Sequence, residues 1–383
     1  MLKKINKLIY IVPVRLPTRK AYGQQIVKMC EAFARQGVEV ELVLPRREKS
    51  GDDIFSFYGI EPVFTVKFLQ VPDMIGMFGW LKIVPYYLQV FFILWQLRSI
   101  KFNQDDVVLT RSPEVAYFLK RFRNVKVWLS AHSLPSKQKR WWLRRVIKVF
   151  DGVICNSQGT SKGYQSLGAK KVLPVPNGVD LSLYDKINLS QDELRKKYNL
   201  PLDKYIVTYV GHFYKWKGVG VLLECARLFL KSDKYLFLLV GGSDVDIDYY
   251  QKIIDRDRLF NVKLLGYKPP RQIPEILKLS NALVLPNIPL TDESVNFTSP
   301  LKMFEYMASQ RPIIASDLPS IREVLNDKNC LFFVPGNASD LQDKIIRLSD
   351  HPEMAEQLSR QAYQDVQVYS WEKRAQRILD FFL

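Results

Sequence analysis

The feature that most constrains the fold is a repeated succession of a short apolar strand, a polar loop and a helix. Near the start of the chain, residues 8–12 predict a strand, residues 23–36 a helix that ends at Gly37, and residues 38–44 a second strand. A strand, a helix and a strand in this order predict parallel pairing with a crossover helix. Similar strands recur as far as residue 334. We therefore expect α/β sheets whose ligands bind at the carboxyl ends of the strands.

Length, charge and cysteine usage bound the class of protein. Because one core rarely serves a chain of 383 residues, two domains are expected. Lysine and arginine number 56 against 39 aspartate and glutamate, which gives a net charge of +17. This excess favours an anionic partner: a polyanion, an anionic membrane surface or a phosphorylated substrate. The four cysteines are widely spaced and match neither a disulfide framework nor a zinc site, so we expect a reduced, intracellular protein without a metal.

Two apolar stretches raise the question of membrane insertion. The first, residues 8–12, is followed by Pro13 and predicts a strand rather than a signal peptide. The second, residues 83–97, carries no charge over 15 residues, whereas a membrane span needs about 20. We interpret the second stretch as a buried or partly membrane-dipping helix.

Residues 298–308 predict a helix start that holds an anion. Ser299 is a preferred N-cap and Pro300 fits the first turn, which leaves the following N–H groups without intrahelical partners. These groups at the positive end of the helix, together with Lys302, suit a phosphate, and Glu305 can accept hydrogen bonds from a pair of hydroxyls. The alternative is an ordinary capped amphipathic helix, and the local sequence leaves both interpretations open.

Residues 136–150 predict a basic helix with six cations and no acid. Arg140, Arg144 and Lys148 recur at every fourth position and share one face, with Trp141 beside them. A basic face with an interfacial tryptophan suits a helix that rests on anionic lipid. A solvated surface helix with core-facing tryptophans is the alternative. Nucleic-acid binding is a third interpretation, but no helix-turn-helix, zinc finger or aromatic RNA-binding motif accompanies the patch.

Three strings carry a resemblance to a known family. They read TSPLKMFEYMASQRPIIAS at 298–316, PNGVD at 176–180 and GHFYKWKG at 211–218. They resemble the family 4 glycosyltransferases, which are retaining enzymes of the GT-B fold: two doubly wound Rossmann-like α/β domains that face each other across a cleft. The resemblance covers nearly the whole chain. It implies an acceptor-binding domain at 1–183, a nucleotide-sugar-binding domain at 184–365, and a C-terminal helix, 366–383, that packs back on the first domain.

The resemblance also assigns roles to single residues. His132 corresponds to a histidine near the transferred sugar, and Lys217 to a lysine on the donor diphosphate; these are the expected catalytic residues. Arg19 and Arg111 are candidates for acceptor binding, with a surface role left open for each. The loops at 266–268 and 286–287 resemble those that line the nucleotide base. The expected donor-binding residues are Gly23, His212, Gly218, Tyr267, Thr298, Ser299, Pro300, Leu301, Lys302 and Glu305.

The sequence departs from the family pattern at three positions. His212 stands where arginine is usual, Phe297 where a glutamate is usual, and Gly23 alone remains of the glycines in the first loop. These departures keep open a non-catalytic GT-B subunit that binds nucleotide sugars. An epimerase or phosphorylase of the same fold, and a basic nucleic-acid-binding protein, also stay open.

The resemblance and the basic helix together predict the activity. We expect a hexosyltransferase that moves a sugar from a nucleotide-diphosphate sugar, a UDP-sugar first, with retention and with neither a metal nor a cofactor. The expected acceptor is a glycan that is lipid-linked or membrane-associated, as in polysaccharide or glycolipid biosynthesis. The expected partners are the nucleotide sugar, this acceptor and an anionic membrane surface, and not a nucleic acid. The expected location is the cytoplasm, peripheral on the inner face of the membrane.

Overall fold

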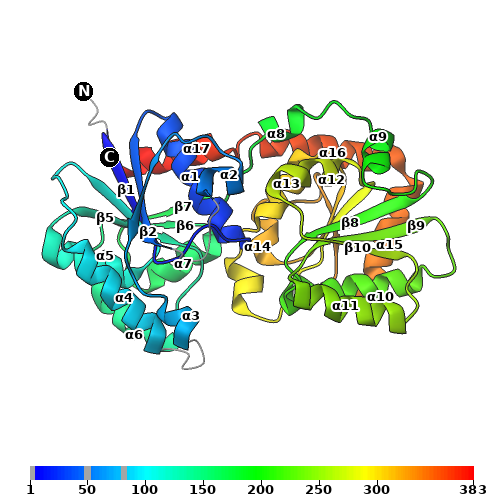
Figure 1. The fold of residues 1–383 in the computed structure, drawn as a ribbon. Helices are drawn as coiled ribbons and strands as arrows, with labels where there is room; N and C mark the ends of the chain where they lie inside the picture. Colours follow the sequence, from blue (N-terminus) through cyan, green and yellow to red (C-terminus); the bar gives the residue numbers. More distant parts are fainter. Residues whose placement is uncertain (1–4, 47–52, 79–83) are drawn as a thin grey trace. The chain divides into compact units, whose positions relative to one another are not determined.

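The structure is a computed structural model that describes residues 5–46, 53–78 and 84–383. The chain forms two compact units (Figure 1). Unit 1 comprises the residues up to Pro176 together with Trp371–Leu383, and unit 2 comprises Asn177–Ser370. The sequence placed the two junctions at 183/184 and 365/366, whereas the chain changes units at 176/177 and 370/371.

Unit 1 is built on a parallel sheet of seven strands in the order β3-β2-β1-β4-β5-β6-β7. The strands are β1 Lys7–Ile11, β2 Glu39–Pro45, β3 Thr65–Leu69, β4 Val107–Thr110, β5 Lys126–Ala131, β6 Gly152–Cys155 and β7 Val172–Pro174. The helices are α1 Ala21–Arg35, α2 Ile54–Tyr58, α3 Met74–Phe78, α4 Val84–Leu97, α5 Pro113–Arg123, α6 Lys137–Val146, the 3₁₀ turn η2 Ile147–Val149, α7 Gln158–Ser166 and α17 Trp371–Phe382.

Both faces of this sheet are covered by helices. On one face, Ile9 and Ile11 of β1 join a buried cluster with residues of α4, α5 and α6. On the other, Trp128 of β5 packs against the rings of Phe381 and Phe382 in α17, with ring centroids 5.0 and 4.9 Å apart. Alternate side chains along each strand therefore pack into two cores, one on each face of the sheet, as expected of a doubly wound sheet.

Unit 2 is built on a second parallel sheet, of six strands in the order β10-β9-β8-β11-β12-β13. The strands are β8 Tyr205–Gly211, β9 Tyr235–Gly241, β10 Val262–Gly266, β11 Ala282–Leu285, β12 Ile313–Ser316 and β13 Leu331–Phe333. The helices are α8 Ser182–Asp185, α9 Gln191–Lys197, η3 Lys215–Lys217, α10 Val219–Leu228, α11 Asp244–Arg256, η4 Pro270–Gln272, α12 Ile273–Lys278, the π-helix η5 Glu293–Phe297, α13 Leu301–Ala308, α14 Pro319–Arg322, α15 Ala338–Asp350 and α16 Pro352–Val366.

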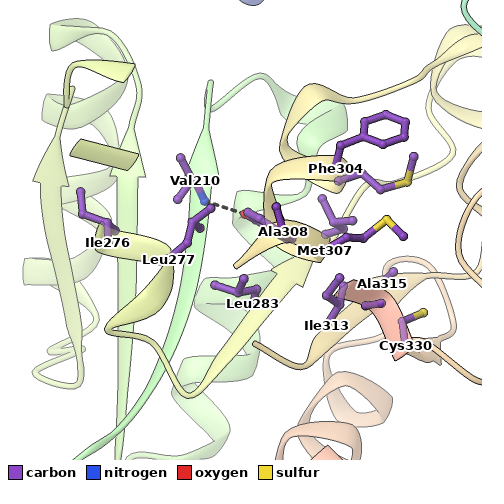
Figure 2. Packing of buried hydrophobic residues seen from close by; sticks show 14 of the residues in the cluster. Val210, Ile276, Leu277, Leu283, Phe304, Met307, Ala308, Ile313, Ala315 and Cys330 are labelled. Carbon is purple, nitrogen blue, oxygen red and sulfur yellow. Dashed lines mark hydrogen bonds between the residues drawn. The ribbon is translucent and has the colours of Figure 1, made fainter. Parts of the chain in front are cut away.

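The unit 2 sheet also separates two cores. Figure 2 shows one of them, in which Val210 of β8 and Leu283 of β11 lie in the same cluster as Phe304 and Met307 of α13. The neighbouring strand residues Tyr209 and Val284 belong to the cluster on the opposite face. The predicted architecture of two doubly wound α/β domains is confirmed.

Residues 177–180 of the string PNGVD belong to unit 2, and the contacts of Asn177 give the reason. Its backbone N–H donates to Ser299 Oγ (3.1 Å) and its Nδ2 donates to the Ser299 carbonyl (2.7 Å). Val179 forms a bridge with Ser370. These bonds tie the turn to unit 2, which explains why the chain changes units directly after Pro176 rather than at the predicted junction after residue 183.

Helix boundaries agree with the sequence at some positions and not at others. The sequence predicts a helix over residues 190–198 with Ser190 as its cap, and this is confirmed, since Ser190 caps α9 and exchanges hydrogen bonds with Glu193. The predicted basic helix at 136–150 is shorter: α6 ends at Val146, and the next residues form the 3₁₀ turn η2. Lys148 therefore does not continue the helical face of Arg144, and the prediction of one continuous face is wrong.

The uncharged stretch at 83–97 forms α4 from Val84 onward; Ile83 lies outside the described residues. One side of α4 is buried, but five large apolar side chains on it are exposed: Val84, Tyr87, Leu88, Phe91 and Trp95. Among the described residues, no helix combines the length and the apolar character needed to cross a membrane.

The contact between α17 and the unit 1 sheet yields a stability prediction. Phe382 is 5% exposed and packs on Trp128, so Phe382→Ala should lower the free energy of unfolding of unit 1 by about 3 kcal/mol. Phe122→Ala, at a ring on α5 that is 65% exposed, should change it by about 0.5 kcal/mol or less. Urea unfolding of the full chain measures both, and equal effects would contradict the packing described.

Candidate functional site

A loop that leaves the centre of the unit 2 sheet forms one side of the candidate site. The chain passes from the end of β8 to α10 through residues 212–218, with one turn of 3₁₀ helix at η3. Gly218 has a φ of +76°, and a Cβ atom there would lie 1.7 Å from the carbonyl oxygen of Pro286. Glycine alone fits this position. The loop therefore lies against the carboxyl end of the neighbouring strand β11.

The first turn of α13 adds a buried cation. Lys302 is 8% exposed, its Nζ lies 3.7 Å from the centroid of the Tyr209 ring, and no described residue accepts a hydrogen bond from it. Gly211, at the end of β8, makes the approach possible, since a Cβ there would lie 3.1 Å from that Nζ. Burial, and next the charge of Lys217, hold the pKa of Lys302 well below its ordinary value, while Glu305 acts in the opposite direction.

Lys217 is the second cation. It is half-buried at the end of η3, and its Nζ lies 3.6 Å from the centroid of the Trp216 ring. Burial lowers the pKa of Lys217 to about 7, and Glu293 opposes this shift. In the described part of unit 2, two cations therefore repel each other without forming an ion pair. A ligand group with two or more negative charges would offset the repulsion between the two lysines and favour the charged form of each. A diphosphate is such a group.

The predicted cap of the neighbouring helix is wrong. No side chain caps α13, and Pro300 rather than Ser299 occupies the N-cap position. Ser299 is instead buried and holds the Asn177 backbone and side chain through its Oγ and its carbonyl oxygen. The Ser299 hydroxyl, which the local sequence assigned to the start of α13, is therefore bonded to Asn177, more than a hundred residues away in sequence.

Backbone donors nevertheless remain open at this helix start. The N–H of Met303 bonds to the Pro300 carbonyl at 3.1 Å. For the N–H groups of Leu301 and Lys302, the described residues offer no acceptor. Their positions at the positive end of the helix add to the attraction that the two lysines exert on an anion.

The other predicted residues of unit 2 lie on the elements around this site. The ring of His212 stacks on Tyr214, with centroids 5.0 Å apart and planes at 11°, and the His212 carbonyl accepts a hydrogen bond from Tyr209 Oη (2.6 Å). Thr298 is buried just before α13, and Tyr267 directly follows β10. The donor-binding roles of these residues stay predictions.

The structure adds to the candidate site two residues that the sequence did not select. Asn287 is fully buried just past β11, and neither polar atom of its side chain has a partner among the described residues. Leaving a buried amide without hydrogen bonds is costly, so a ligand or water is expected there. Glu293, whose position does not match the family pattern, is the acid that acts on Lys217. The only sequence signal for Asn287 is a polar residue at a strand's carboxyl end.

Unit 1 places two predicted residues after adjacent strands. Arg111 follows β4 and His132 follows β5, and these strands pair in parallel. His132 Nε2 lies 3.1 Å from Ser130 Oγ, and its carbonyl accepts a hydrogen bond from Asn156 Nδ2 (3.3 Å). Burial, followed by the charges of Arg111 and Arg374, holds the pKa of His132 well below its ordinary value. The imidazole is therefore neutral at neutral pH.

Gly23 has a packing reason to be glycine. A Cβ atom at this position would lie 2.1 Å from Tyr58 Oη and 2.8 Å from Thr18 Cγ2. Close approach of the loop thus requires glycine whether or not a ligand binds. Arg19 is exposed just before α1. The donor role of Gly23 and the acceptor role of Arg19 stay predictions.

Two family models match the chain, one on each half. The model described as Glycosyltransferase Family 4 matches residues 23–183, and the model described as Glycosyl transferases group 1 matches residues 190–365. Among curated relatives, D-inositol 3-phosphate glycosyltransferase of Thermomonospora curvata is 25% identical, over 54% of this chain and 50% of its own length. The chain thus spans about half the length of this relative.

Solved structures share the fold over nearly their full length. Sucrose-phosphate synthase from Thermosynechococcus elongatus superposes with a TM-score of 0.77 at 19% identity and covers 97% of each chain. Anabaena HepE in complex with UDP-glucose superposes with a TM-score of 0.74 at 14% identity and covers 98% of each chain. The predicted GT-B fold is confirmed.

The unpaired ammonium group of Lys302 should cost stability in the absence of ligand. Replacing it with an apolar side chain of similar length, Lys302→Met, should raise the free energy of unfolding by about 1–3 kcal/mol. Because the folded-state pKa is lowered, the gain should be largest at acidic pH and shrink as the pH rises toward the ordinary lysine pKa. Thermal unfolding across pH measures it, with the exposed Lys215→Met as control; a loss of stability in Lys302→Met would contradict the assignment.

Proposed function

Because this chain belongs to the family 4 glycosyltransferases of the GT-B fold, we propose that it transfers a sugar from a nucleotide-diphosphate sugar to a glycan acceptor with retained configuration. The observation that carries the proposal is the pair Lys217 and Lys302, two cations held without an ion pair beside the open helix start of α13 in the described part of unit 2. Such a pair suits the diphosphate of a UDP-sugar.

The chemistry follows from where charge develops. As the bond between the anomeric carbon and the diphosphate oxygen breaks, negative charge grows on the leaving group, and fixed cations in a buried site stabilise it. The acceptor oxygen then bonds to the anomeric carbon and passes its proton to the departing diphosphate oxygen. Lys217 and Lys302 bind the leaving group in this scheme, and Glu305 accepts hydrogen bonds from ribose hydroxyls.

His132 fits a role in orienting the sugar. Its lowered pKa keeps the ring neutral, so the ring can donate one hydrogen bond and accept another, but it offers no positive charge. Ser130 Oγ takes one of these positions at Nε2. The second ring nitrogen is the atom we assign to a sugar hydroxyl.

Titration of the two lysines predicts proton-linked donor binding. Lys217 has a pKa of about 7 in the free protein, and a bound diphosphate should raise it, so at pH 8 UDP binding should take up about one proton. Above pH 7 the affinity for UDP should therefore fall as the pH rises. Titration calorimetry in buffers of different ionisation enthalpy measures the uptake. Comparison with GDP and ADP tests the choice of nucleotide.

Variants sharpen this test. Lys217→Ala should weaken UDP binding at least about tenfold, because a hydrogen bond to a charged group is lost. It should also reduce the proton uptake and abolish sugar transfer. Lys215→Ala, an exposed lysine of the same loop, should bind UDP normally. Unchanged UDP binding in both Lys217→Ala and Lys302→Met would overturn the proposed donor site.

A membrane-associated acceptor is supported by one face of unit 1. α4 exposes aromatic and aliphatic side chains, and α6 lies beside it, since Lys139 Nζ is 4.5 Å from the Tyr86 ring centroid and 5.3 Å from that of Tyr87 (Figure 1). Exposed apolar side chains next to cations are typical of surfaces that bind anionic lipid. We propose that this face rests peripherally on the inner surface of the membrane.

The predicted lipid-facing residues differ in exposure. Trp141 is exposed, and Arg145 lies over its ring at 3.7 Å; Arg144 and Lys148 are exposed as well. Arg140 is half-buried, and its Nε donates to the Pro135 carbonyl at 2.9 Å. Arg140 is therefore the least available of the four predicted lipid-facing residues.

Vesicle binding tests the membrane proposal. Phe91→Glu with Trp95→Glu should reduce binding to phosphatidylglycerol-containing vesicles at least about tenfold, because burial of both rings is lost. Arg144→Glu with Lys148→Glu should reduce binding to anionic vesicles and not to neutral ones. The control, Tyr249→Glu with Phe260→Glu, alters equally exposed rings of unit 2. If this control loses as much binding as the α4 variant, the assigned face is wrong.

A further inference from the structure

A second group of cations without acidic partners lies in the described part of unit 1, at the carboxyl ends of β1, β4 and β5. Arg111 follows Thr110, which pairs with Ile11 of β1 and Leu129 of β5. Arg374 comes to the same place from the first turn of α17, since Tyr10 and Arg111 both act on it electrostatically. Strands and helix that are far apart in sequence thus bring two guanidinium groups together.

No acidic side chain of the described residues balances these groups. The groups that favour the charge of Arg111 are Tyr10 and Tyr22, and within the same residues Arg111 forms neither an ion pair nor a hydrogen bond. Burial lowers the pKa of Arg111 and lowers that of Arg374 to about 9. Taking a guanidinium group out of water without an anion is unfavourable. The cluster therefore has the composition expected of an anion-binding site.

The two arginines are not equivalent. Arg374 is 3% exposed and donates through one guanidinium nitrogen to the carbonyl oxygens of Val175 and Pro176, while its Nε has no partner among the described residues. These bonds anchor it, so it contributes fixed charge. Arg111 makes no such bonds, and its forked set of donors is available to a ligand.

A buried hydroxyl points to a ligand independently of the charges. Tyr10 is 1% exposed, and although Ser130 acts on its hydroxyl, that hydroxyl reaches no hydrogen-bond geometry with any described residue. Ser130 Oγ is engaged with His132 Nε2. Buried hydroxyls are nearly always hydrogen-bonded. Tyr10 thus supplies a donor that the protein itself leaves unused.

The N-terminus of α1 adds positive electrostatic potential near the same arginines. Tyr22, which acts on Arg111, lies in the first turn of this 15-residue helix, and that turn has no acidic residue and no side-chain cap. The N-terminal end of a helix favours negative charge. Helix start, arginines and hydroxyl all favour an oxyanion.

We propose that this cluster binds an oxyanion of the phosphate type that belongs to the sugar acceptor, with Arg111 as the forked donor and the Tyr10 hydroxyl as the neutral one. The proposal rests on the proposed function, because it takes the donor's diphosphate to be bound by Lys217 and Lys302 of unit 2. Because the lysines of unit 2 then neutralise the diphosphate of the donor, the cations of unit 1 are available to the second substrate. The acceptor class is then a phosphorylated glycan or glycolipid.

The experiment measures UDP binding to the full chain, and separately measures inorganic phosphate binding with UDP at saturation so that the unit 2 site is occupied, by thermal shift and calorimetry. Arg111→Gln should weaken phosphate binding at least about tenfold and leave UDP binding within about twofold, since one charged hydrogen-bonding partner is lost in unit 1 alone. It should also raise the melting temperature without ligand, because a half-buried charge without an ion-pair partner is removed. Arg111→Lys should retain part of the phosphate binding, and Arg121→Gln, at an exposed arginine of α5, should change nothing.

Any of three results would overturn the proposal. The first is a wild-type chain that binds UDP but not phosphate. The second is unchanged phosphate binding in Arg111→Gln, or in Arg111→Lys if the first variant does not fold. The third is a loss of UDP binding together with phosphate binding, which would assign the cluster to the nucleotide's own diphosphate. Failure of the donor site is distinguishable, because it appears as UDP binding that ignores Lys217 and Lys302 while phosphate binding still depends on Arg111.

Discussion

The buried ammonium group of Lys302 is the constraint on which the candidate donor site depends. It is held against the Tyr209 ring without a hydrogen bond to any described residue, a position that would not persist unless its surroundings forced it. They do so through α13, where the two residues that follow the lysine, Met303 and Phe304, are fully buried. Further along the helix, Tyr306 Oη accepts a hydrogen bond from the Val210 N–H at 2.9 Å. Core packing thus supplies the free energy that keeps an unpaired cation in place.

Much of the fold could be predicted because it depends on local pattern. Apolar strands and polar strand ends predicted both sheets, although not the edge strand β3. The Ser190 cap depends on a glutamate only three residues away. The prediction of a helix cap was wrong where a group distant in sequence competed for the capping hydroxyl. Asn177 takes Ser299 from the helix it was expected to cap. No local pattern contains that bond, since it joins residues 122 positions apart.

The candidate site was predicted in part for the same reason. Lys217 and Lys302 stand in strings whose family resemblance is strong, so their place in the sequence was enough to select them. Arg374 and Tyr10 stand in no such string: one lies in a C-terminal helix and the other inside the first strand, and only tertiary structure brings them to Arg111. Their lack of acidic partners among the described residues is also invisible in a sequence that holds 39 acidic residues.

The net charge of +17 is therefore a poor guide to where anions bind. Many of the cations are exposed, where water and salt screen them. The cations that we assign to anion binding form two pairs, Lys302 with Lys217 in unit 2 and Arg374 with Arg111 in unit 1. The first of each pair is buried and the second is half-buried. Each pair lies at the carboxyl ends of parallel strands and raises the cost of the empty state, so a bound anion gains affinity from relief of repulsion as well as from contact. The proposed transfer between two anionic substrates would give a reason for one such pair in each unit.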